Sequence, residues 1–556
     1  MASKIKVDTL ETANGSGSIT INNPINTAGI TSVTLGTSNF VAGVNAGNSI
    51  TSGGNYNTTI GDEAGTAITT GDNNVAVGYN SLTANTTGTD SVAIGHSALL
   101  AQTTGGDNVA IGHLAMSSLT TAGNNTAVGD RAMQANTSGE NNVAIGTLAL
   151  DANTTGASNT AVGRDSLTAN TTGTQNTAVG KSALAANTTA GQNTAMGREA
   201  LFANTTGADN TAIGAAALYS NTTASSNTAV GRSCLINNTT GAENVAVGAE
   251  SLDANTTGVQ NNAIGYLSLT SCTTGSYNVA MGVAALNDTT TGESNVALGH
   301  LSSYSNLTGS SNTAVGQKSF YTNTTGTSNV VVGKSAMYYN TTGAGNTAVG
   351  VNALTANTTA SNNTAVGTDA LKANTTGSLN VAVGRHALIG CTTGSDNTGI
   401  GTYALDSTTT GNSNIAIGHG AISTSSTASG QCTLGNSAIS NLRCNDTSIS
   451  SLSDSRDKTD VVDSPFGLDF INTVRPVQFL WDSRDGNAKD GTTRIGFLAQ
   501  ELLAATNGNN AVLDLVLDDN PDKLEAKYGN LLPIMVQAIQ ELSAKNDALE
   551  TQNATF

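Results

Sequence analysis

Aromatic side chains, charged side chains and proline are all scarce in this chain of 556 residues. Aromatic residues make up 4% and charged residues 11%, and there are 5 prolines against 63 glycines. So few large apolar side chains cannot fill the cores of several ordinary globular domains. Such a composition is also typical of disorder, but disorder does not require the strict periodicity described below. The scarcity therefore favours a thin, repetitive core.

Basic residues are outnumbered by acidic ones. The chain has 21 Lys and Arg against 39 Asp and Glu, which gives a formal net charge of −18. An acidic surface argues against nucleic acid and anionic lipid as partners and favours the solubility of a long particle. We therefore predict a protein that does not bind nucleic acid.

The sequence also lacks a secretory signal and a membrane-spanning run. The opening Met-Ala-Ser-Lys-Ile-Lys-Val-Asp contains no apolar core of signal length. No apolar stretch has the length that a bilayer requires. We expect synthesis and assembly in a cytoplasm without membrane insertion, and exit inside a virion or by lysis.

A seventeen-residue repeat organises most of the chain. Glycine returns every 17 residues from Gly61 to Gly435, giving 23 phased glycines without insertion or deletion. A typical unit is Asn-Thr-Ala-Val-Gly-x-x-Ala-Leu-x-Ala-Asn-Thr-Thr-Gly-x-x. The residue four places before the phased glycine is Asn in 21 of the 23 units, and the residue directly before it is Val, Ile, Leu or Met. Internal repeats of this kind indicate a stacked architecture.

A unit this short suits one coil of a β-solenoid or β-roll with two short strands and two turns. We expect the aliphatic residue before each phased glycine, and the Leu four residues after it, to stack into a narrow core. The near-constant Ala two residues before the phased glycine leaves room for close packing, inside the coil or against a neighbouring chain. The glycine permits positive φ or close backbone approach. Stacked Asn side chains can form a hydrogen-bonded ladder. Because one thin roll buries few large side chains, we expect three chains to share their apolar faces.

The unit resembles the head repeats of trimeric autotransporter adhesins, in which a short Asn/Ser-x-Ala-Ile/Val-Gly strand recurs in a left-handed parallel β-roll. The resemblance covers roughly residues 57–440. Those adhesins require a secretion signal and an outer-membrane anchor. We expect neither in this chain, so the resemblance implies a similar shaft rather than a bacterial surface protein.

Histidine and cysteine form no metal-ligand pattern. Each His lies one or two places after a phased glycine, and the odd number of widely spaced Cys includes no Cys-x-x-Cys. Small buried apolar cysteines are expected rather than a disulfide framework or a zinc site. We predict no metal and no cofactor. The residues are His96, His113, His300, His386 and His419, and Cys234, Cys272, Cys391, Cys432 and Cys444.

The C-terminal end has a different composition, with the only Trp and four of the five prolines in residues 453–556. Four motifs follow one another: Ser-Asp-Ser-Arg-Asp-Lys at 453–458, Arg-Pro-Val-Gln-Phe-Leu-Trp at 475–481, Ile-Gly-Phe-Leu-Ala-Gln-Glu-Leu at 495–502 and Tyr-Gly-Asn-Leu-Leu-Pro at 528–533. This end resembles the intramolecular chaperone of endosialidases and related phage fibres. The resemblance implies an α+β trimer that folds the preceding fibre and then cuts itself off.

By this resemblance, Ser453 is the nucleophile and Lys458 its general base at the Ser453–Asp454 junction, with Arg456 and Asp454 orienting the loop. A serine hydroxyl needs a base, and lysine serves as one only where burial or nearby cations lower its pKa. Folding and trimerisation are expected to supply that burial, which would make cleavage a sensor of folding. Which peptide bond beside Ser453 is cut stays open, and a solvated charged turn is the alternative. We expect no activity on other substrates.

The last segment predicts a coiled-coil helix. Its apolar residues alternate spacings of three and four, which is the seam along which helices associate. Three such helices would hold the chain ends in register, because a one-coil slip between identical repeats costs little. A helix packed within a single chain is the alternative. The seam comprises Leu532, Met535, Ile539, Leu542, Asn546, Leu549 and Asn553.

Together these patterns predict a mostly β, trimeric protein in four parts. Residues 1–56 would dock on a virion, 57–440 form the shaft, 441–452 connect, and 453–556 act as the self-cleaving chaperone. The function indicated is a structural phage tail fibre that attaches to a host. Expected partners are two further copies, a tail or baseplate protein at the N-terminus, and a host surface receptor such as a glycan. The alternatives are a bacterial surface adhesin with a phage-type chaperone and a carbohydrate-degrading tailspike, for which the repeats offer only scattered acids.

Overall fold

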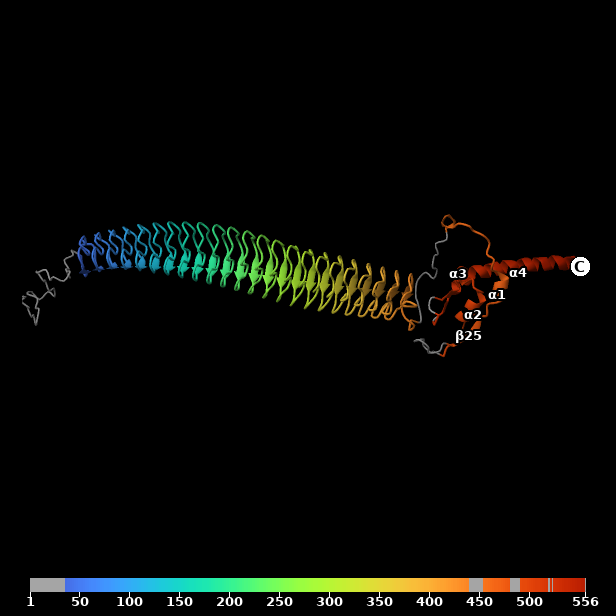
Figure 1. The fold of residues 1–556 in the computed structure, drawn as a ribbon. Helices are drawn as coiled ribbons and strands as arrows, with labels where there is room; N and C mark the ends of the chain where they lie inside the picture. The colour runs from blue at the N-terminus through green and yellow to red at the C-terminus, as the bar shows by residue number, and fades with distance from the viewer. Residues whose placement is uncertain (1–35, 440–453, 481–490, 519–520, 523, 556) are drawn as a thin grey trace, which may run out of the picture. The chain divides into compact units, whose positions relative to one another are not determined.

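The computed structural model describes residues 36–439, 454–480, 491–518, 521–522 and 524–555. These residues fall into two compact units, 1–310 and 311–556. In the first unit, three-residue strands follow one another as successive arrows along one side of the coils (Figure 1). They are β1 (Phe40–Ala42), β2 (Thr58–Ile60), β3 (Val75–Val77), β4 (Val92–Ile94), β5 (Val109–Ile111), β6 (Thr126–Val128), β7 (Val143–Ile145), β8 (Thr160–Val162), β9 (Thr177–Val179), β10 (Thr194–Met196), β11 (Thr211–Ile213), β12 (Thr228–Val230), β13 (Val245–Val247), β14 (Asn262–Ile264), β15 (Val279–Met281) and β16 (Val296–Leu298).

The second unit repeats the same coil and then changes to an α+β domain. Its solenoid strands are β17 (Thr313–Val315), β18 (Val330–Val332), β19 (Thr347–Val349), β20 (Thr364–Val366), β21 (Val381–Val383), β22 (Thr398–Ile400), β23 (Ile415–Ile417) and β24 (Cys432–Leu434). The later elements are η1 (Ser455–Asp457), α1 (Leu468–Ile471), β25 (Val477–Phe479), β26 (Arg494–Gly496), α2 (Ala499–Ala505), α3 (Asn510–Leu513), β27 (Val516–Leu517), β28 (Glu525–Ala526), η3 (Tyr528–Asn530) and α4 (Leu531–Ala554). None of the helices in the described ranges carries an apolar run that would reach across a bilayer.

Residues seventeen apart lie side by side in a parallel ladder. In β9 and β10, for example, Thr177 pairs with Thr194 and Val179 with Met196. The predicted β-solenoid is therefore confirmed. The ladder also includes β1, within the segment 1–56, which pairs with β2 through a step of one extra residue.

Each coil contains one strand, so the expectation of two strands per coil is wrong. The opposite side of the coil places some residues in the left-handed region; Ser182 and Leu184 have φ of 55° and 54°. Such a conformation costs a non-glycine residue roughly 1–2 kcal/mol. Bonds between coils offset that cost, because Ser182 N donates to Arg164 O at 2.9 Å and Leu184 N to Ala200 O at 2.9 Å. Both sides of the coil are thus tied to their neighbours.

The core consists of the middle residue of each strand and the Leu that follows the phased glycine. Ala178 and Leu184 have no exposed surface. The residue directly before the phased glycine points outward instead, with Met196 43% exposed and Ile213 39% exposed. The expectation that these aliphatic residues fill the core is wrong. In a three-residue strand only the central side chain faces inward, and both of its neighbours face away.

Stacked coils form two buried asparagine ladders rather than the single one expected, because a regular coil contributes two asparagines. Asn176 Nδ2 donates to Asn159 Oδ1 at 3.2 Å, which belongs to the ladder four residues before the phased glycine. The second ladder lies seven residues after it, where Asn187 Nδ2 donates to Asn170 Oδ1 at 2.9 Å. Both side chains of a coil also donate to one carbonyl, that of Ala190, at 2.9 and 3.0 Å. In a regular coil such as this one, both asparagine side chains are therefore hydrogen-bonded.

Cysteine interrupts the second Asn ladder. Cys272 and Cys391 are fully buried, and burial raises their thiol pKa to about 12 and about 11. The expectation of buried cysteines is confirmed for these two and for Cys234, but Cys432 is exposed and Cys444 lies outside the described residues. Next to the interruptions, the Oδ1 atoms of Asn255 and Asn374 have no hydrogen-bond partner. An unpaired buried acceptor costs roughly 1–3 kcal/mol.

The phased glycines test this architecture. Gly180 has φ of +135°, and a Cβ added there would lie 2.5 Å from Gly197 O in the next coil. We expect Gly180→Ala to destabilise the adjacent coils by on the order of 3 kcal/mol, because neither backbone can move away. Hydrogen exchange of the amides in residues 160–215 measures the effect. Lys181→Ala, an exposed neighbour, should change the protection little, and equal protection in both variants would contradict the coil geometry.

Candidate self-cleavage site and association face

The later three C-terminal sequence motifs meet in one small domain. Strands β25 and β26 pair antiparallel, with Val477 opposite Gly496. Arg475 Nε donates to Glu501 Oε2 at 2.9 Å, which joins the second motif to the third. The Tyr528 ring of the fourth motif packs edge-on against Phe497 at 5.4 Å, and Phe497 N donates to the Tyr528 hydroxyl at 3.3 Å. The second, third and fourth motifs, which are separate in the sequence, therefore contact one another in the folded domain.

The core of this domain is apolar and joins its helices to the strand β27. It contains the Phe470 ring of α1 together with leucines of α2 and α3 and apolar residues in the first turn of α4. Partly buried side chains such as Phe466 and Phe497 extend it. The fully or nearly buried members are Phe470, Leu502, Leu513, Leu515, Val516, Leu531 and Ile534.

Residues 454–458 of the predicted cleavage motif form a tight turn on the surface. Asp454 caps η1, and its Oδ1 accepts hydrogen bonds from Arg456 N at 2.9 Å and Arg456 Nε at 3.0 Å. The bonds from the Arg456 side chain and backbone hold the pKa of Asp454 below its usual range. Since both side chains are exposed, this pair sets the geometry of the turn more than it stabilises the fold.

Of the two predicted catalytic residues, Lys458 lies within the described part of the chain and Ser453 does not. Lys458 follows η1 directly, its N donates to Ser455 O at 3.4 Å, and the residue is exposed. Ser453 lies outside the described residues, so the proposed Ser453–Lys458 contact stays a prediction. Arg456 and Asp454, which were expected to orient the loop, pair with each other through Nε and Nη2 of the guanidinium, and their role in cleavage stays a prediction.

Helix α4 presents two different apolar faces. Leu531, Ile534 and Ala538 are buried against the domain. The predicted seam lies elsewhere on the helix and is open, with Leu532 65% and Ile539 64% exposed. The alternative of a seam packed within one chain therefore does not hold for these residues. The exposed members are Leu532, Met535, Ile539, Leu542, Asn546 and Leu549.

Glu541 of α4 caps the first helix of the domain. Its Oε2 accepts a hydrogen bond from Leu468 N at 2.8 Å, and its Oε1 accepts one from Gln537 Nε2 at 3.2 Å. A Cβ added at Gly467 would meet this carboxylate, so a larger residue there would displace Glu541 from its position at the helix start. The bond from Leu468 N is the main reason that the pKa of Glu541 is lowered. Sequence reasoning missed this contact because nothing in the sequence links residues so far apart.

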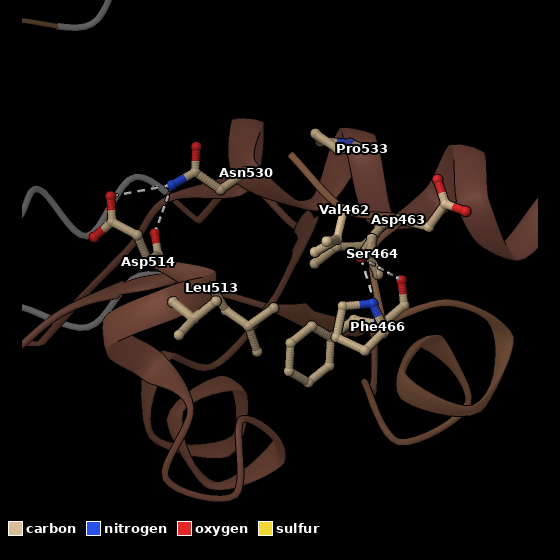
Figure 2. A pocket seen from close by; sticks show the side chains of 11 residues that line it. Val462, Asp463, Ser464, Phe466, Leu513, Asp514, Asn530 and Pro533 are labelled. Carbon is tan, nitrogen blue, oxygen red and sulfur yellow. Dashed lines mark hydrogen bonds between the residues drawn. The ribbon is translucent and has the colours of Figure 1, made fainter. Parts of the chain in front are cut away.

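An open cavity of about 400 Å³ lies between the segment that follows the cleavage motif and the start of α4. Figure 2 shows Asn530 Nδ2 bonded to the carbonyl and carboxylate of Asp514, at 2.6 and 3.3 Å. The Asp514 carboxylate also accepts from Lys527 Nζ at 2.7 Å. Within the described ranges no three His, Cys, Asp or Glu side chains gather as metal ligands. The cavity is lined by Val462, Asp463, Ser464, Pro465, Phe466, Val512, Leu513, Asp514, Asn530, Pro533 and Ile534.

This arrangement can be compared with known families. Residues 453–513 match the family model of the chaperone of endosialidase. The match begins at Ser453 and extends through α3, so it spans the cleavage motif and the second and third motifs. The chain matches no curated protein. A chaperone-of-endosialidase domain behind a long β-solenoid fits a protein of the phage tail fibre or tailspike kind.

The Glu541 cap predicts how this chaperone domain responds to pH. Because its pKa is lowered in the folded state, the carboxylate contributes stability above its unfolded pKa, and this is lost as pH falls through the lower folded value. We expect hydrogen-exchange protection around Leu468 to fall several-fold as the pH is lowered through the acidic range. Glu541→Gln should reduce the protection at neutral pH and flatten its pH dependence. Glu550→Gln, near the end of α4, is the control, and an identical pH profile in both variants would contradict the cap.

Proposed function

We propose that the chain is the subunit of a homotrimeric phage tail fibre that attaches the virion to its host. The β-solenoid would be the shaft, and the chaperone domain would trimerise and fold it. The observation that carries this proposal is the combination of the C-terminal family match with an apolar surface that the single chain leaves open.

An aliphatic stripe along the solenoid sheet supports association of the shaft. Within each unit, many of the residues directly before a phased glycine are more than a third exposed. Soluble monomers rarely expose so many apolar side chains along one face. Within each unit, the same stripe on another copy has the same spacing of one side chain per coil, ~4.8 Å, so the two stripes can interlock. Members are Ile60, Ile94, Ile111, Ile145, Met196, Ile213, Ile264, Met281, Leu298, Val366, Val383, Ile400, Ile417 and Leu434.

The open seam of α4 supports association of the chaperone. A helix with Leu, Met and Ile at alternating spacings of three and four buries them against partner helices. Asn546 at one of these positions is exposed in the single chain and would select one register at some cost in stability. Three helices aligned in this way would start the three shafts at the same coil.

Self-cleavage would follow assembly. Ser453 Oγ would attack a carbonyl carbon beside it while Lys458 accepts the hydroxyl proton and passes it to the departing amide nitrogen. Water would then hydrolyse the resulting ester and separate the two fragments; which of the two bonds at Ser453 breaks stays open. A lysine base must be shielded from water, but Lys458 is exposed in the single chain. We infer that a neighbouring chain covers it in the trimer, so that cutting waits for assembly. The chain would have no activity on other substrates.

The remaining roles complete the fibre. The N-terminal segment 1–56 would dock on a tail or baseplate protein, and a surface of the shaft would bind a host receptor. The protein would be synthesised in the host cytoplasm and would function as part of the virion.

Two substitutions separate assembly from cleavage. Wild-type protein should sediment as a trimer and yield two fragments separated at or beside Ser453 on denaturing electrophoresis. Ser453→Ala should remain a trimer of uncut chains. Ile539→Asp places a charge on the seam and should prevent both trimerisation and cutting, whereas Gln540→Asp, exposed on another face, should behave as wild type. A trimeric wild type that stays uncut would refute the cleavage step, and a monomeric wild type would refute the fibre.

A further inference from the structure

A column of polar and aromatic side chains runs along one corner of the second unit. It occupies the position two residues after the phased glycine in consecutive coils. Asn352 Nδ2 donates to Asp369 Oδ1 at 3.1 Å, and His386 Nε2 lies 3.4 Å from Asp369 Oδ2. The Tyr403 ring then packs edge-on against His386 at 4.9 Å. Each member therefore contacts the next along the column.

The Tyr403 ring is held rigidly on this side. The Arg385 guanidinium carbon lies 4.9 Å from the ring centroid, and Arg385 Nη2 donates to the Tyr403 hydroxyl at 2.9 Å. The backbone is fixed as well, because Tyr403 N donates to Arg385 O at 3.0 Å. An aromatic ring that is already ordered loses little entropy when a ligand packs on it.

The column ends at Gly420, one coil after Tyr403. Because Gly420 has no side chain, no further ring or polar group continues the column at this position. Gly420 has φ of +62°, close to the +61° of Tyr403, so its backbone continues the same geometry. A Cβ built there would make only ordinary contacts with Asn436, the nearest at 3.5 Å. Among the described residues, only Asn436 comes within 4 Å of a side-chain atom built at Gly420, and the His419 ring lies edge-on to Tyr403 at 6.2 Å.

We propose that this notch binds an acidic saccharide, which would be the receptor chemistry read by the shaft; the inference rests on the proposed attachment function. The position beyond Tyr403 is one coil, ~4.8 Å, further along the column, a spacing at which a sugar ring can place its apolar C–H face against the Tyr403 ring. A guanidinium has five N–H donors, and its bond to Tyr403 uses one of them, so Arg385 can also bind a carboxylate.

The chain itself provides a blocking substitution. Leucine occupies the corresponding position of other coils in the same left-handed conformation, as at Leu148 and Leu267 with φ of 57°. Gly420→Leu should therefore fold normally while filling the notch. Ala216→Leu, at the same position of a distant coil, is the matched control.

Titration of the full-length protein with hexagalacturonate and with neutral galactohexaose, observed by saturation-transfer NMR, tests the proposal. We expect binding of hexagalacturonate only, at least tenfold weaker in Gly420→Leu, Tyr403→Ala and Arg385→Ala. Tyr403→Phe keeps the ring and should bind within about threefold of wild type, and Ala216→Leu should be unchanged. Binding that is absent, equal for the neutral sugar, or unaffected by Gly420→Leu would overturn the assignment. The trimer and its cleavage are measured on the same samples, so a cut trimer that binds no saccharide rejects this site and leaves the fibre assembly standing.

Discussion

Two buried asparagines in each regular coil donate to one backbone carbonyl, and each is bonded to the asparagine of an adjacent coil. Asn176 and Asn187 do so at Ala190, within a coil whose remaining core consists of alanine and one leucine. Low polarity around such amides makes a satisfied network favourable and an unsatisfied one costly. The other residues of the coil are compatible with this network. Alanine lets the strands lie close together, glycine leaves space for the backbone of the next coil, and leucine adopts a left-handed conformation.

This economy leaves the outer surface apolar. Each strand buries only its central side chain, so an aliphatic side chain such as Met196 faces outward beside every phased glycine. Identical rungs also permit slippage, because a shift of one coil exchanges each asparagine for another. In the proposed trimer, the shafts would bury each other's outward aliphatic side chains. The exposed seam of α4 would prevent slippage by aligning the three chains before the shafts associate.

The stacked repeat could be predicted because phase is visible in one sequence, and so could the first Asn ladder and the apolar seam that α4 leaves exposed. The direction of the aliphatic residues could not, since a three-residue strand is too short for alternation to identify its inner face. The left-handed Leu184 was equally hidden, because leucine does not favour that conformation and only inter-coil bonds maintain it. In the chaperone, four motifs located the domain, but the Glu541 cap depends on tertiary contact between distant segments.

A density map of the full-length protein at side-chain resolution tests the central claim most directly. The account predicts parallel strands ~4.8 Å apart with Val179 beside Met196, both pointing outward, and Asn176 directly over Asn193. A map with two strands in each coil, or with Val179 packed inside the coil against Leu184, would contradict it.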